Sequence, residues 1–322
     1  MSIKVAVIGA SGIGLHHARW HHLSGSEVVG FVGTSPDSNT RTASRLQNDF
    51  GFSGRSYTDV KEMLTCEKPE LVDVCSPFEN HREHVIMALD AGCHVVCEKP
   101  LCWDMTQTLD EILTDGAAML EAVHRASGEL VMSAQYPASI PYYKDLYIRE
   151  RGAWDEIESV YMEMEVKGRK GQKSGEDIWI DLATHPLSLA RGFLPGFDMD
   201  WRTARCVISG RENRAVFDCL RHGKRCQVEF VLRDIDSGTP VRRFGVNSFL
   251  VDWTGYADEN AIYRAKLSRG EQAIACSDFM HVLIQDFTRH ISGQGGHIWV
   301  TAQDAFQNLK DQIELLKLAR QA

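Results

Sequence analysis

Residues 3–14 have the sequence IKVAVIGASGIG, a short apolar run that continues directly into a glycine-rich turn. The apolar run predicts a strand that is buried on both faces, and the residues after it predict a helix over 13–23. Gly9, Gly12 and Gly14 stand between the two, where the backbone has to turn sharply and come close to a ligand. The N-terminus of a helix binds phosphate through its N–H groups and its dipole, so this stretch predicts a dinucleotide-binding turn.

The glycine spacing departs from the common fingerprint GxGxxG at one position, because Ser11 stands where the middle glycine is usual. The place of the turn, after a strand and before a helix, makes the pattern specific despite that change. The alternative is a tight turn that binds nothing. The residues that we expect to contact the cofactor here are Gly9, Ser11, Gly12, Ile13 and Gly14.

Four histidines follow the turn within seven residues: His16, His17, His21 and His22. His17 and His21 are four residues apart and share one helix face, a spacing that can hold a metal ion. No glutamate stands between them as in the HExxH zinc motif, and only the beginning of such a helix faces the cofactor. We therefore predict no metal site. We interpret the histidines as a polar helix surface, with His17 near the cofactor.

Strand and helix patterns alternate over the first 134 residues. Further strands are expected at SEVVGFVG, PELVDVCSP, CHVVCEKP and ELVMSAQ, and further helices over 42–50, 79–91 and 105–126. This alternation predicts an α/β fold with a doubly wound parallel sheet. Residues 1–134 are therefore expected to form a dinucleotide-binding Rossmann domain.

From residue 135 onward the pattern changes to a period of two. VYMEMEV and CQVEFVLR alternate apolar and polar residues, as strands with two differently exposed faces do, and such strands are usually antiparallel. Other strands are expected at ARCVISG, RAVFDCL, NSFLVDW and AIYRAKL, and helices over 271–291 and 302–320, the last with Thr301 as its N-cap. Residues 135–322 are therefore expected to form an α+β domain for substrate binding and oligomerisation, with a large, mostly antiparallel open sheet.

The composition argues against several classes of protein. The 322 residues carry a formal net charge of −9, which disfavours a general binder of nucleic acid or of anionic membranes. No apolar run reaches the ~20 residues that span a bilayer, and the N-terminus lacks the apolar core of a signal peptide. The nine cysteines show no paired spacing, so we expect reduced, mostly buried thiols in a cytoplasmic protein. A catalytic thiol at Cys97 or Cys102 is an alternative that no feature of the sequence favours.

The end of the second expected strand bears on the choice of cofactor. NAD-binding chains usually place an acidic residue about 20 residues after the glycines, where it binds the ribose hydroxyls. Here Gly33, Thr34 and Ser35 occupy this region, and none of them is acidic. The hydroxyls of Thr34 and Ser35 can donate hydrogen bonds to a 2′-phosphate, and Arg41 or Arg45 can add positive charge. We therefore favour NADP over NAD; the alternative is NAD held loosely through the backbone.

Residues 76–101, SPFENHREHVIMALDAGCHVVCEKPL, form the most specific stretch of the chain. They resemble the Gfo/Idh/MocA family of oxidoreductases (glucose–fructose oxidoreductase and inositol dehydrogenase), whose pattern is roughly TPNxxH, AL-AG-HV and EKP. The matching residues are Pro77, His81, Ala88, Leu89, Ala91, Gly92, His94, Val95, Glu98, Lys99 and Pro100, with an earlier GxxHA at Gly14, His17 and Ala18. Ser76 replaces the family's threonine and Phe78 its asparagine.

The resemblance implies that Lys99 is catalytic and contacts the substrate. It also implies cofactor contacts from Ser76, Pro77, His81, Glu98 and Lys99. The chemistry agrees, because a lysine at the carboxyl end of a parallel strand lies where such sheets bind ligands. There it can donate to a substrate oxygen and stabilise developing negative charge. In the family the proline of EKP often follows a cis peptide bond. The alternative is a solvent-exposed lysine at a strand end.

A second motif, GEDIWIDLATHPLSLARGFLPG, contains Asp181 and His185. Their spacing of four puts both on one face if the segment is helical, and a histidine beside a carboxylate can act as a general base. The resembling family pattern is DxGxHxxD, in which Ala183 here replaces the glycine and Ser188 the last aspartate. The resemblance implies catalytic roles and substrate contacts for Asp181 and His185.

Taken together, the resemblance implies hydride transfer between a nicotinamide cofactor and a sugar, cyclitol or related polyol or carbonyl compound. In that reaction His185 exchanges the hydroxyl proton, Lys99 holds the same oxygen, and Asp181 orients His185 or binds a neighbouring hydroxyl. Further candidates for substrate contacts are Gln135, Tyr136, Lys167 and Trp179.

Two other functions stay open at this point. One is reduction or oxidation of a non-sugar carbonyl, diol or imine on the same scaffold. The other is a non-catalytic regulatory protein that binds a dinucleotide, which the presence of Lys99, Asp181 and His185 disfavours. The segment 101–131 looks longer than is usual in the family, and we assign it no function. Large open sheets in such second domains imply a homodimer or homotetramer.

Overall fold

A computed structural model describes residues 2–167, 174–221 and 223–321, and it divides the chain into two compact units. The first unit comprises Met1–Ala134 and Met280–Leu309, and the second comprises Gln135–Phe279 and Lys310–Ala322. The break after residue 134 lies where the sequence places a domain boundary. The segment Met280–Leu309, however, clusters with the first unit and not with the second.

Helix α9 (Phe279–Ile291) explains this difference. Its Phe287 is buried in an apolar cluster with Val5, Leu71 and Val96, which come from strands of the first unit. The apolar periodicity of this segment predicts a helix, but it does not tell which core the helix joins, because that depends on contacts far apart in the sequence.

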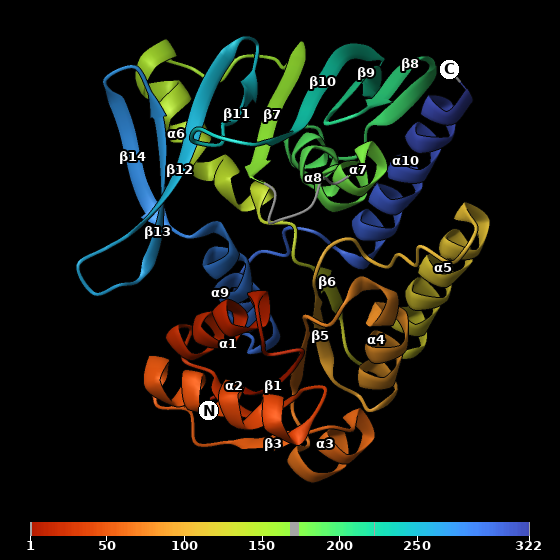
Figure 1. Cartoon of the computed structure of the whole chain (residues 1–322). Coiled ribbons are helices and arrows are strands. Elements are labelled where there is room, and N and C mark those ends of the chain that lie inside the picture. The colour runs from red at the N-terminus through yellow and green to blue at the C-terminus, as the bar shows by residue number, and fades with distance from the viewer. Residues whose placement is uncertain (1, 168–173, 222, 322) are drawn as a thin grey trace. The chain divides into compact units, whose positions relative to one another are not determined.

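Six parallel strands form the sheet of the first unit, in the order β3-β2-β1-β4-β5-β6 (Figure 1). Their bounds are β1 Lys4–Ile8, β2 Glu27–Val32, β3 Arg55–Tyr57, β4 Leu71–Val74, β5 His94–Cys97 and β6 Leu130–Met132. The strand order reverses between β1 and β4, as in doubly wound dinucleotide-binding folds. The predicted Rossmann sheet is therefore confirmed.

Helices connect these strands and bury both faces of the sheet. Their bounds are α1 Ile13–Leu23, α2 Pro36–Phe50, α3 Val60–Glu67, the 3₁₀ turn η1 Phe78–Asn80, α4 His81–Asp90 and α5 Leu109–Arg125. The sequence patterns did not predict β3 and α3, because both elements are too short to show a clear period.

Two helices begin at different residues from those predicted, and their caps explain why. Helix α2 begins at Pro36 and not at residue 42, because Ser35 forms a capping box with Ser38 and proline suits the first helical position. Helix α5 begins at Leu109 and not at residue 105, because Thr108 forms a capping box with Glu111.

Eight strands form the sheet of the second unit, in the order β14-β13-β12-β11-β7-β10-β9-β8 (Figure 1). Their bounds are β7 Ser159–Lys167, β8 Asp198–Ser209, β9 Glu212–Arg221, β10 Lys224–Ile235, β11 Arg242–Val246, β12 Phe249–Ala257, β13 Tyr263–Arg269 and β14 Gln272–Ser277. Neighbouring strands pair antiparallel, except for β7 and β10, which are parallel. The predicted large, mostly antiparallel sheet is confirmed.

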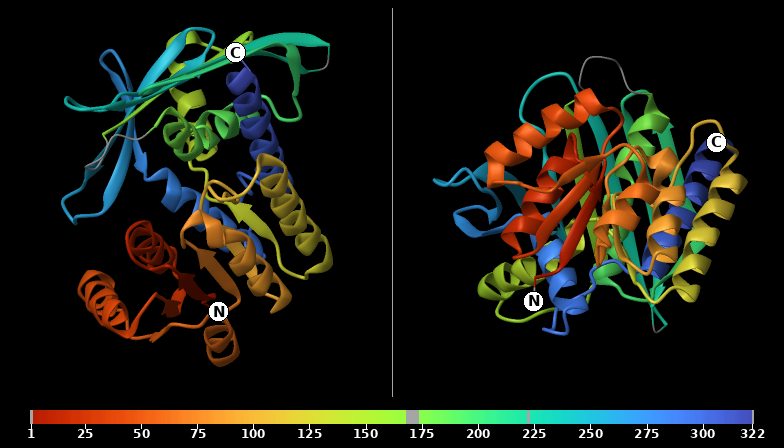
Figure 2. Two further views of the ribbon diagram at one scale, coloured as in Figure 1. Left: turned by 45° about the vertical axis from the view of Figure 1, so that its right-hand side comes forward. Right: turned by 90° about the horizontal axis from the view of Figure 1, so that it is seen from below.

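Helices α7 and α8 lie against one face of this second sheet, drawn in green below the teal strands in the left view of Figure 2. Trp179 of α7 stacks on Phe230 of β10, with 5.8 Å between the ring centroids. The helices of this unit are the 3₁₀ turn η2 Tyr136–Ser139, α6 Ile140–Arg151, α7 Gly175–Leu182, α8 Thr184–Phe193 and the end of α10 Ala302–Gln321.

The helix predicted over 271–291 is wrong in its first part. Residues Gln272–Ser277 form strand β14, which pairs antiparallel with β13, and α9 begins only at Phe279. A short apolar run fits a strand as well as a helix, and here the tight turn after β13 decides for the strand. The prediction of Thr301 as an N-cap is confirmed, since its Oγ1 accepts a hydrogen bond from Asp304 N at 3.1 Å.

The nine cysteines all lie in the described part of the chain, where none forms a disulfide and all but Cys66 and Cys276 are buried. Burial raises the pKa of Cys97 well above its ordinary value and that of Cys102 to about 12. Both stay protonated near neutral pH and are poor nucleophiles. Among the described helices, none is long and apolar enough to cross a membrane.

Candidate active site

The turn between β1 and α1 is shaped by glycines that cannot carry a side chain. Gly9 has φ +85°, and a Cβ atom there would lie 2.7 Å from the carbonyl oxygen of Cys75. At Gly14 a Cβ atom would lie 2.2 Å from the carbonyl oxygen of Gly9. Any larger residue at either position would force the turn away from the end of β4 or from α1.

The beginning of α1 is open to a ligand. Gly12 is the N-cap, with φ +63°, and a Cβ atom there would meet nothing within 4 Å. No described side chain caps this N-terminus, and Ser11, Gly12 and Ile13 are exposed. The uncapped N–H groups of a helix bind anionic oxygens, so this turn fits the pyrophosphate of a dinucleotide.

The loop between β2 and α2 contains the residues predicted to select the cofactor. The Ser35 hydroxyl accepts a hydrogen bond from Ser38 N at 3.3 Å, so it serves as the cap of α2. A Cβ atom at Gly33 would lie 1.9 Å from Oδ1 of Asn39, which explains the glycine there. Thr34 is exposed, as are Arg41 and Arg45 on α2.

The loop after β4 holds Ser76, Pro77 and His81. His81 is buried, and its ring nitrogens lie 2.9 Å from the Ser76 carbonyl oxygen and 3.0 Å from that of Pro100. Burial lowers the pKa of His81 although the two carbonyls act in the opposite direction. His81 therefore joins the ends of β4 and β5 from within the protein, while Pro77 is exposed and Ser76 half-buried beside it.

The motif Glu98-Lys99-Pro100 lies at the carboxyl end of β5, and its Lys99–Pro100 peptide is cis. Lys99 is half-buried. Glu98 is only 8% exposed, and its Oε1 accepts a hydrogen bond from the Ser133 hydroxyl at 2.6 Å. Its N–H donates to the Val74 carbonyl of β4 at 2.9 Å. The structure thus brings the motif to the edge of the sheet where parallel sheets bind ligands.

The interpretation of the α1 histidines as a polar surface is wrong for two of the four. His16 and His22 are exposed, but His17 and His21 are fully buried. His17 Nδ1 and His21 Nε2 lie 2.9 and 2.7 Å from the same carboxylate oxygen of Asp73, a buried residue of β4. A buried carboxylate requires hydrogen-bond donors, so Asp73 keeps both rings inside the unit.

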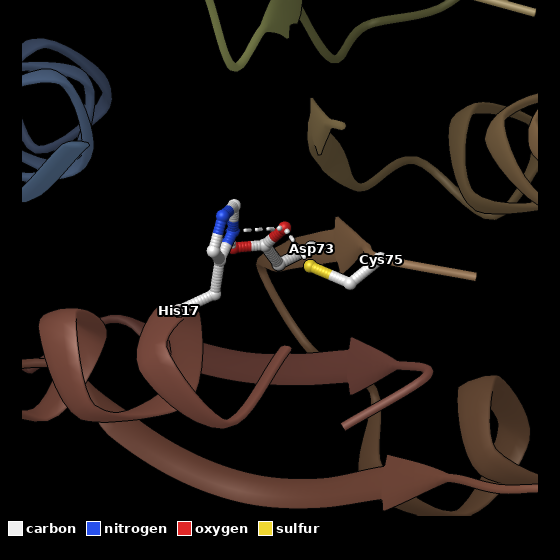
Figure 3. A group of neighbouring side chains, drawn as sticks. All are labelled: His17, Asp73 and Cys75. Atoms are coloured by element: carbon white, nitrogen blue, oxygen red, sulfur yellow. Dashed lines mark hydrogen bonds and ion pairs between the residues drawn. The ribbon is translucent and has the colours of Figure 1, made fainter. Parts of the chain in front are cut away.

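Three atoms of this cluster could in principle bind a metal ion. His17, Asp73 and Cys75 offer ligand atoms within 4.8 Å of one another (Figure 3). Hydrogen bonds account for the arrangement, since Asp73 accepts from both histidines and from the Cys75 thiol, whose sulfur lies 3.3 Å away. Burial raises the pKa of Cys75 far above its ordinary value, so the sulfur stays a thiol and not a metal-binding thiolate. We assign no metal to these residues.

The second unit places His185 beside an aromatic cluster. His185 stands at the beginning of α8, is 5% exposed, and has its ring centroid 5.3 Å from that of Tyr136. Tyr136 also makes edge-to-face contacts with Phe244 and Trp253, at 5.8 and 5.6 Å. Burial raises the pKa of Tyr136 above its ordinary value, so its hydroxyl remains a hydrogen-bond donor. The structure therefore brings together Tyr136 and His185, two of the predicted substrate contacts.

The other predicted residues of this unit differ in their exposure to solvent. Asp181 belongs to the last turn of α7 and is half-buried, and Ala183 joins α7 to α8 with near-helical angles. Gln135 precedes η2 and is half-buried. Lys167 ends β7 and is exposed, directly before residues 168–173, which lie outside the described part of the chain.

The structure corrects the prediction that Trp179 contacts the substrate. Its side chain is fully buried, and its indole N–H donates to the Gln312 carbonyl at 3.0 Å. Because the ring also stacks on Phe230, it belongs to the core between α7, α10 and the sheet, and it is not placed to contact a substrate.

A family model described as "Oxidoreductase family, NAD-binding Rossmann fold" matches residues 3–122. Inositol 2-dehydrogenase of Pseudomonas syringae pv. syringae (strain B728a) is 36% identical over 263 residues, which are 80% of this chain and 70% of that protein. The chain belongs to the Gfo/Idh/MocA oxidoreductase family.

Other members of the Gfo/Idh/MocA family match over shorter segments. D-glucoside 3-dehydrogenase of Escherichia coli (strain K12) is 38% identical over 100 residues, which are 30% of this chain and 27% of that protein. The chain therefore aligns with less than a third of that relative's length. A solved structure of levoglucosan dehydrogenase, in complex with NADH and levoglucosan, shares the fold, with a TM-score of 0.75 and 16% identity over 100% of this chain and 98% of that one.

Sequence reasoning missed three buried residues next to the predicted ones in the first unit: Asp73, Cys75 and Ser133. Asp73 did carry a recognisable pattern, because it interrupts the apolar strand LVDVC. A carboxylate inside a strand that is buried on both faces requires buried donors. The pairing of His17 and His21 on one helix face supplies two such donors. Ser133 shows no comparable pattern.

Proposed function

We propose that this chain is an NAD(P)-dependent oxidoreductase that transfers a hydride between a nicotinamide cofactor and a sugar, cyclitol or related polyol. The observation that carries the proposal is Lys99 at the carboxyl end of β5, in the same unit as a glycine turn that fits a dinucleotide. The names of the relatives support this substrate class, because they are dehydrogenases of inositol and of a glucoside.

The chain's own residues suit the two halves of the reaction. When bound, a nicotinamide accepts or supplies the hydride. Lys99 donates a hydrogen bond to the substrate oxygen and stabilises the negative charge that develops on it. His185 takes up the hydroxyl proton during oxidation and returns it during reduction, with Tyr136 packed against its ring. Asp181 orients His185 or binds a neighbouring hydroxyl.

For the choice between the two cofactors we propose NADP(H). The support comes from the β2–α2 loop, where Gly33, Thr34 and Ser35 contain no carboxylate to repel a 2′-phosphate. Exposed Thr34 can donate a hydrogen bond, and exposed Arg41 and Arg45 add positive charge on α2. The Ser35 hydroxyl contributes less than the sequence suggests, because it caps the helix.

A substrate panel tests the proposed function. Cyclitols, aldoses, glycosides and, as a separate group, non-sugar diols, carbonyls and imines are incubated with each cofactor in its oxidised or reduced form. We expect a change in absorbance of the nicotinamide with at least one sugar or cyclitol. Turnover of the non-sugar group alone would favour the alternative substrate class. Cofactor binding without turnover of any compound would favour a regulatory protein. Light scattering measures the mass of the particle in solution and so tests the predicted homodimer or homotetramer.

A further inference from the structure

A chain of three buried side chains joins helix α1 to the ends of β4 and β5 in the first unit. His17 Nδ1 lies 2.9 and 3.1 Å from the two carboxylate oxygens of Asp73, as Figure 3 shows for the first part of this chain. On the other side of the ring, His17 Nε2 lies 3.3 Å from Oε1 of Glu98. His17 and Asp73 are fully buried, and Glu98 is nearly so.

The two carboxylates on opposite sides of the ring favour a charged imidazole, with a hydrogen bond at Nδ1 and an ion-pair distance of 3.3 Å at Nε2. Both ring nitrogens of His17 face carboxylate oxygens, which only accept hydrogen bonds when ionised. A neutral ring carries one N–H, so its other nitrogen would direct a lone pair at a carboxylate. Only the imidazolium presents positive charge to both carboxylates, through a hydrogen bond from Nδ1 to Asp73 and an ion pair between Nε2 and Glu98. It also offsets the cost of enclosing two carboxylates away from water.

Neighbouring groups donate hydrogen bonds to both carboxylates. His21 Nε2 and the Cys75 thiol donate to Asp73, at 2.7 and 3.3 Å. The Ser133 hydroxyl donates to Glu98 at 2.6 Å. One proton on Nε2 is enough for His21 to donate this hydrogen bond.

Removal of the positive charge would act on both carboxylates. When His17 is replaced, Asp73 keeps two donors, His21 and Cys75, and Glu98 keeps the Ser133 hydroxyl and the positive charge of Lys99 next to it. Burial opposes the ionisation of Glu98, and the neighbouring His17 is the main influence that lowers its pKa.

We propose that His17 is a positioning residue, a buried imidazolium between Asp73 and Glu98 that keeps Glu98 ionised and fixed for the nicotinamide half of the cofactor. The sheet order places β5 in the half that binds the second mononucleotide, across the switch point from the turn that binds the pyrophosphate. A carboxylate there favours the positively charged oxidised nicotinamide over the neutral reduced one. The inference rests on the proposed use of a nicotinamide cofactor, and not on the substrate.

The charge of His17 can be measured directly. In ¹⁵N-histidine-labelled protein, two-bond ¹H–¹⁵N spectra distinguish a doubly protonated ring from a neutral one. We expect His17 to remain doubly protonated from pH 6 to pH 8, with its resonances assigned by their loss in His17→Gln. If that variant does not fold, NOEs between the ring and α1 assign the resonances in the unmodified protein. A neutral His17 ring at pH 7 would overturn the proposal.

Cofactor affinity tests the consequence for Glu98. Dissociation constants of the oxidised and reduced cofactor are measured for the unmodified protein, His17→Gln, Glu98→Gln and His17→Gln/Glu98→Gln. We expect each single variant to shift the ratio of the two constants against the oxidised form by about tenfold, the change that ~1.4 kcal/mol produces. The double variant should show the shift once and not twice, because both substitutions remove the same charge. His22→Gln, at an exposed position of the same helix, is the matched control and should leave the ratio unchanged.

Several outcomes would overturn the positioning role. Equal weakening of both cofactor forms in His17→Gln would mean that the residue only packs. Additive shifts in the double variant would mean that His17 does not act through Glu98. If the unmodified protein binds neither form of the cofactor, the proposed function fails together with the inference. The unmodified protein alone reveals this case, so it is distinguished from a failure of the inference, which only the variants reveal.

Discussion

At the scale of single residues, the proposed chemistry depends most on Lys99. Its place at the end of β5 follows from a four-residue strand, three of whose residues are buried, that ends directly before the EKP motif. The ammonium group supplies the one positive charge that the proposed mechanism aims at the substrate oxygen. Replacement by methionine keeps the length of the side chain and removes that charge.

We predict that Lys99→Met lowers turnover of the substrate found in the panel by a factor of about 100 to 1000, as loss of one oxyanion donor does elsewhere. Binding of the reduced cofactor, followed by its fluorescence, should persist. Lys61→Met, on the exposed face of α3, is the matched control and should keep full turnover. Turnover at the level of the control in Lys99→Met would contradict the assignment.

Residue types alone show some site members and hide others. The glycine turn, Lys99 and His185 are recognisable because each stands in a motif of several residues. Trp179 was predicted as a substrate contact because an aromatic ring can bind a sugar, yet its side chain is fully buried in the core. A side chain's role there depends on which element packs over it, and α10 comes more than a hundred residues later.

At the scale of elements, the proposed choice of NADP(H) rests on the junction of β2 and α2. A carboxylate in this loop would repel a 2′-phosphate, and the loop has none between the strand and the helix. Helix α2 begins at Pro36, so the N–H groups of its first turn come directly after Thr34 and Ser35.

We predict that the unmodified protein binds NADPH more tightly than NADH, and that Thr34→Asp reverses this preference. The new carboxylate repels the 2′-phosphate and can accept hydrogen bonds from ribose hydroxyls instead, so NADPH affinity should fall by about tenfold or more. Fluorescence titration with both cofactors measures the change. Thr65→Asp adds the same charge at an exposed position of α3 and should alter neither affinity. Tighter binding of NADH by the unmodified protein would contradict the NADP(H) proposal.

At the scale of the whole molecule, the cluster around His17 makes stability depend on pH. Burial disfavours the protonated form of His17, but the neighbouring Asp73 raises the pKa of His17 well above its ordinary value of 6.5. Burial likewise opposes ionisation of Asp73 and Glu98, but His17 lowers the pKa of both. Because the pKa of His17 is higher in the folded than in the unfolded state, His17 stabilises the folded protein fully at pH values below its unfolded-state pKa. This contribution is lost as the pH rises through its folded-state pKa. The lowered carboxyl pKa values stabilise above about pH 4, and that contribution is lost as the pH falls.

We predict that the free energy of unfolding decreases between pH 6.5 and pH 8 by up to about 1.4 kcal/mol per pH unit, because the folded state then holds a proton that the unfolded state releases. The range ends at pH 8 because buried thiols with raised pKa values, such as Cys75, add their own dependence at higher pH. Urea unfolding at several pH values, followed by circular dichroism, measures this free energy. His17→Gln should lose this slope and His22→Gln should keep it; an unchanged slope in His17→Gln would contradict the assignment of the charge.

The sequence by itself determined the architecture of each unit, because the patterns that indicate it are local. Period-two and buried strand patterns, the glycine turn and the EKP motif each lie within a few dozen residues of chain. They were enough to predict the parallel sheet, the mostly antiparallel sheet and the family. The boundaries that failed, such as the beginning of α2 and the strand β14, depended on caps and on pairing with a neighbour.

Only the tertiary structure decided which core receives α9, which histidines of α1 are buried, and what lies beside Glu98. His17, Asp73 and Glu98 come from three segments, and their burial follows from packing and not from the order of residues. The energy of a buried charge depends on the distance and solvation of its partners, which a sequence does not specify. For this reason the glycine turn could be predicted from twelve residues, whereas the cluster of His17, Asp73 and Glu98 became visible only when α1, β4 and β5 came together.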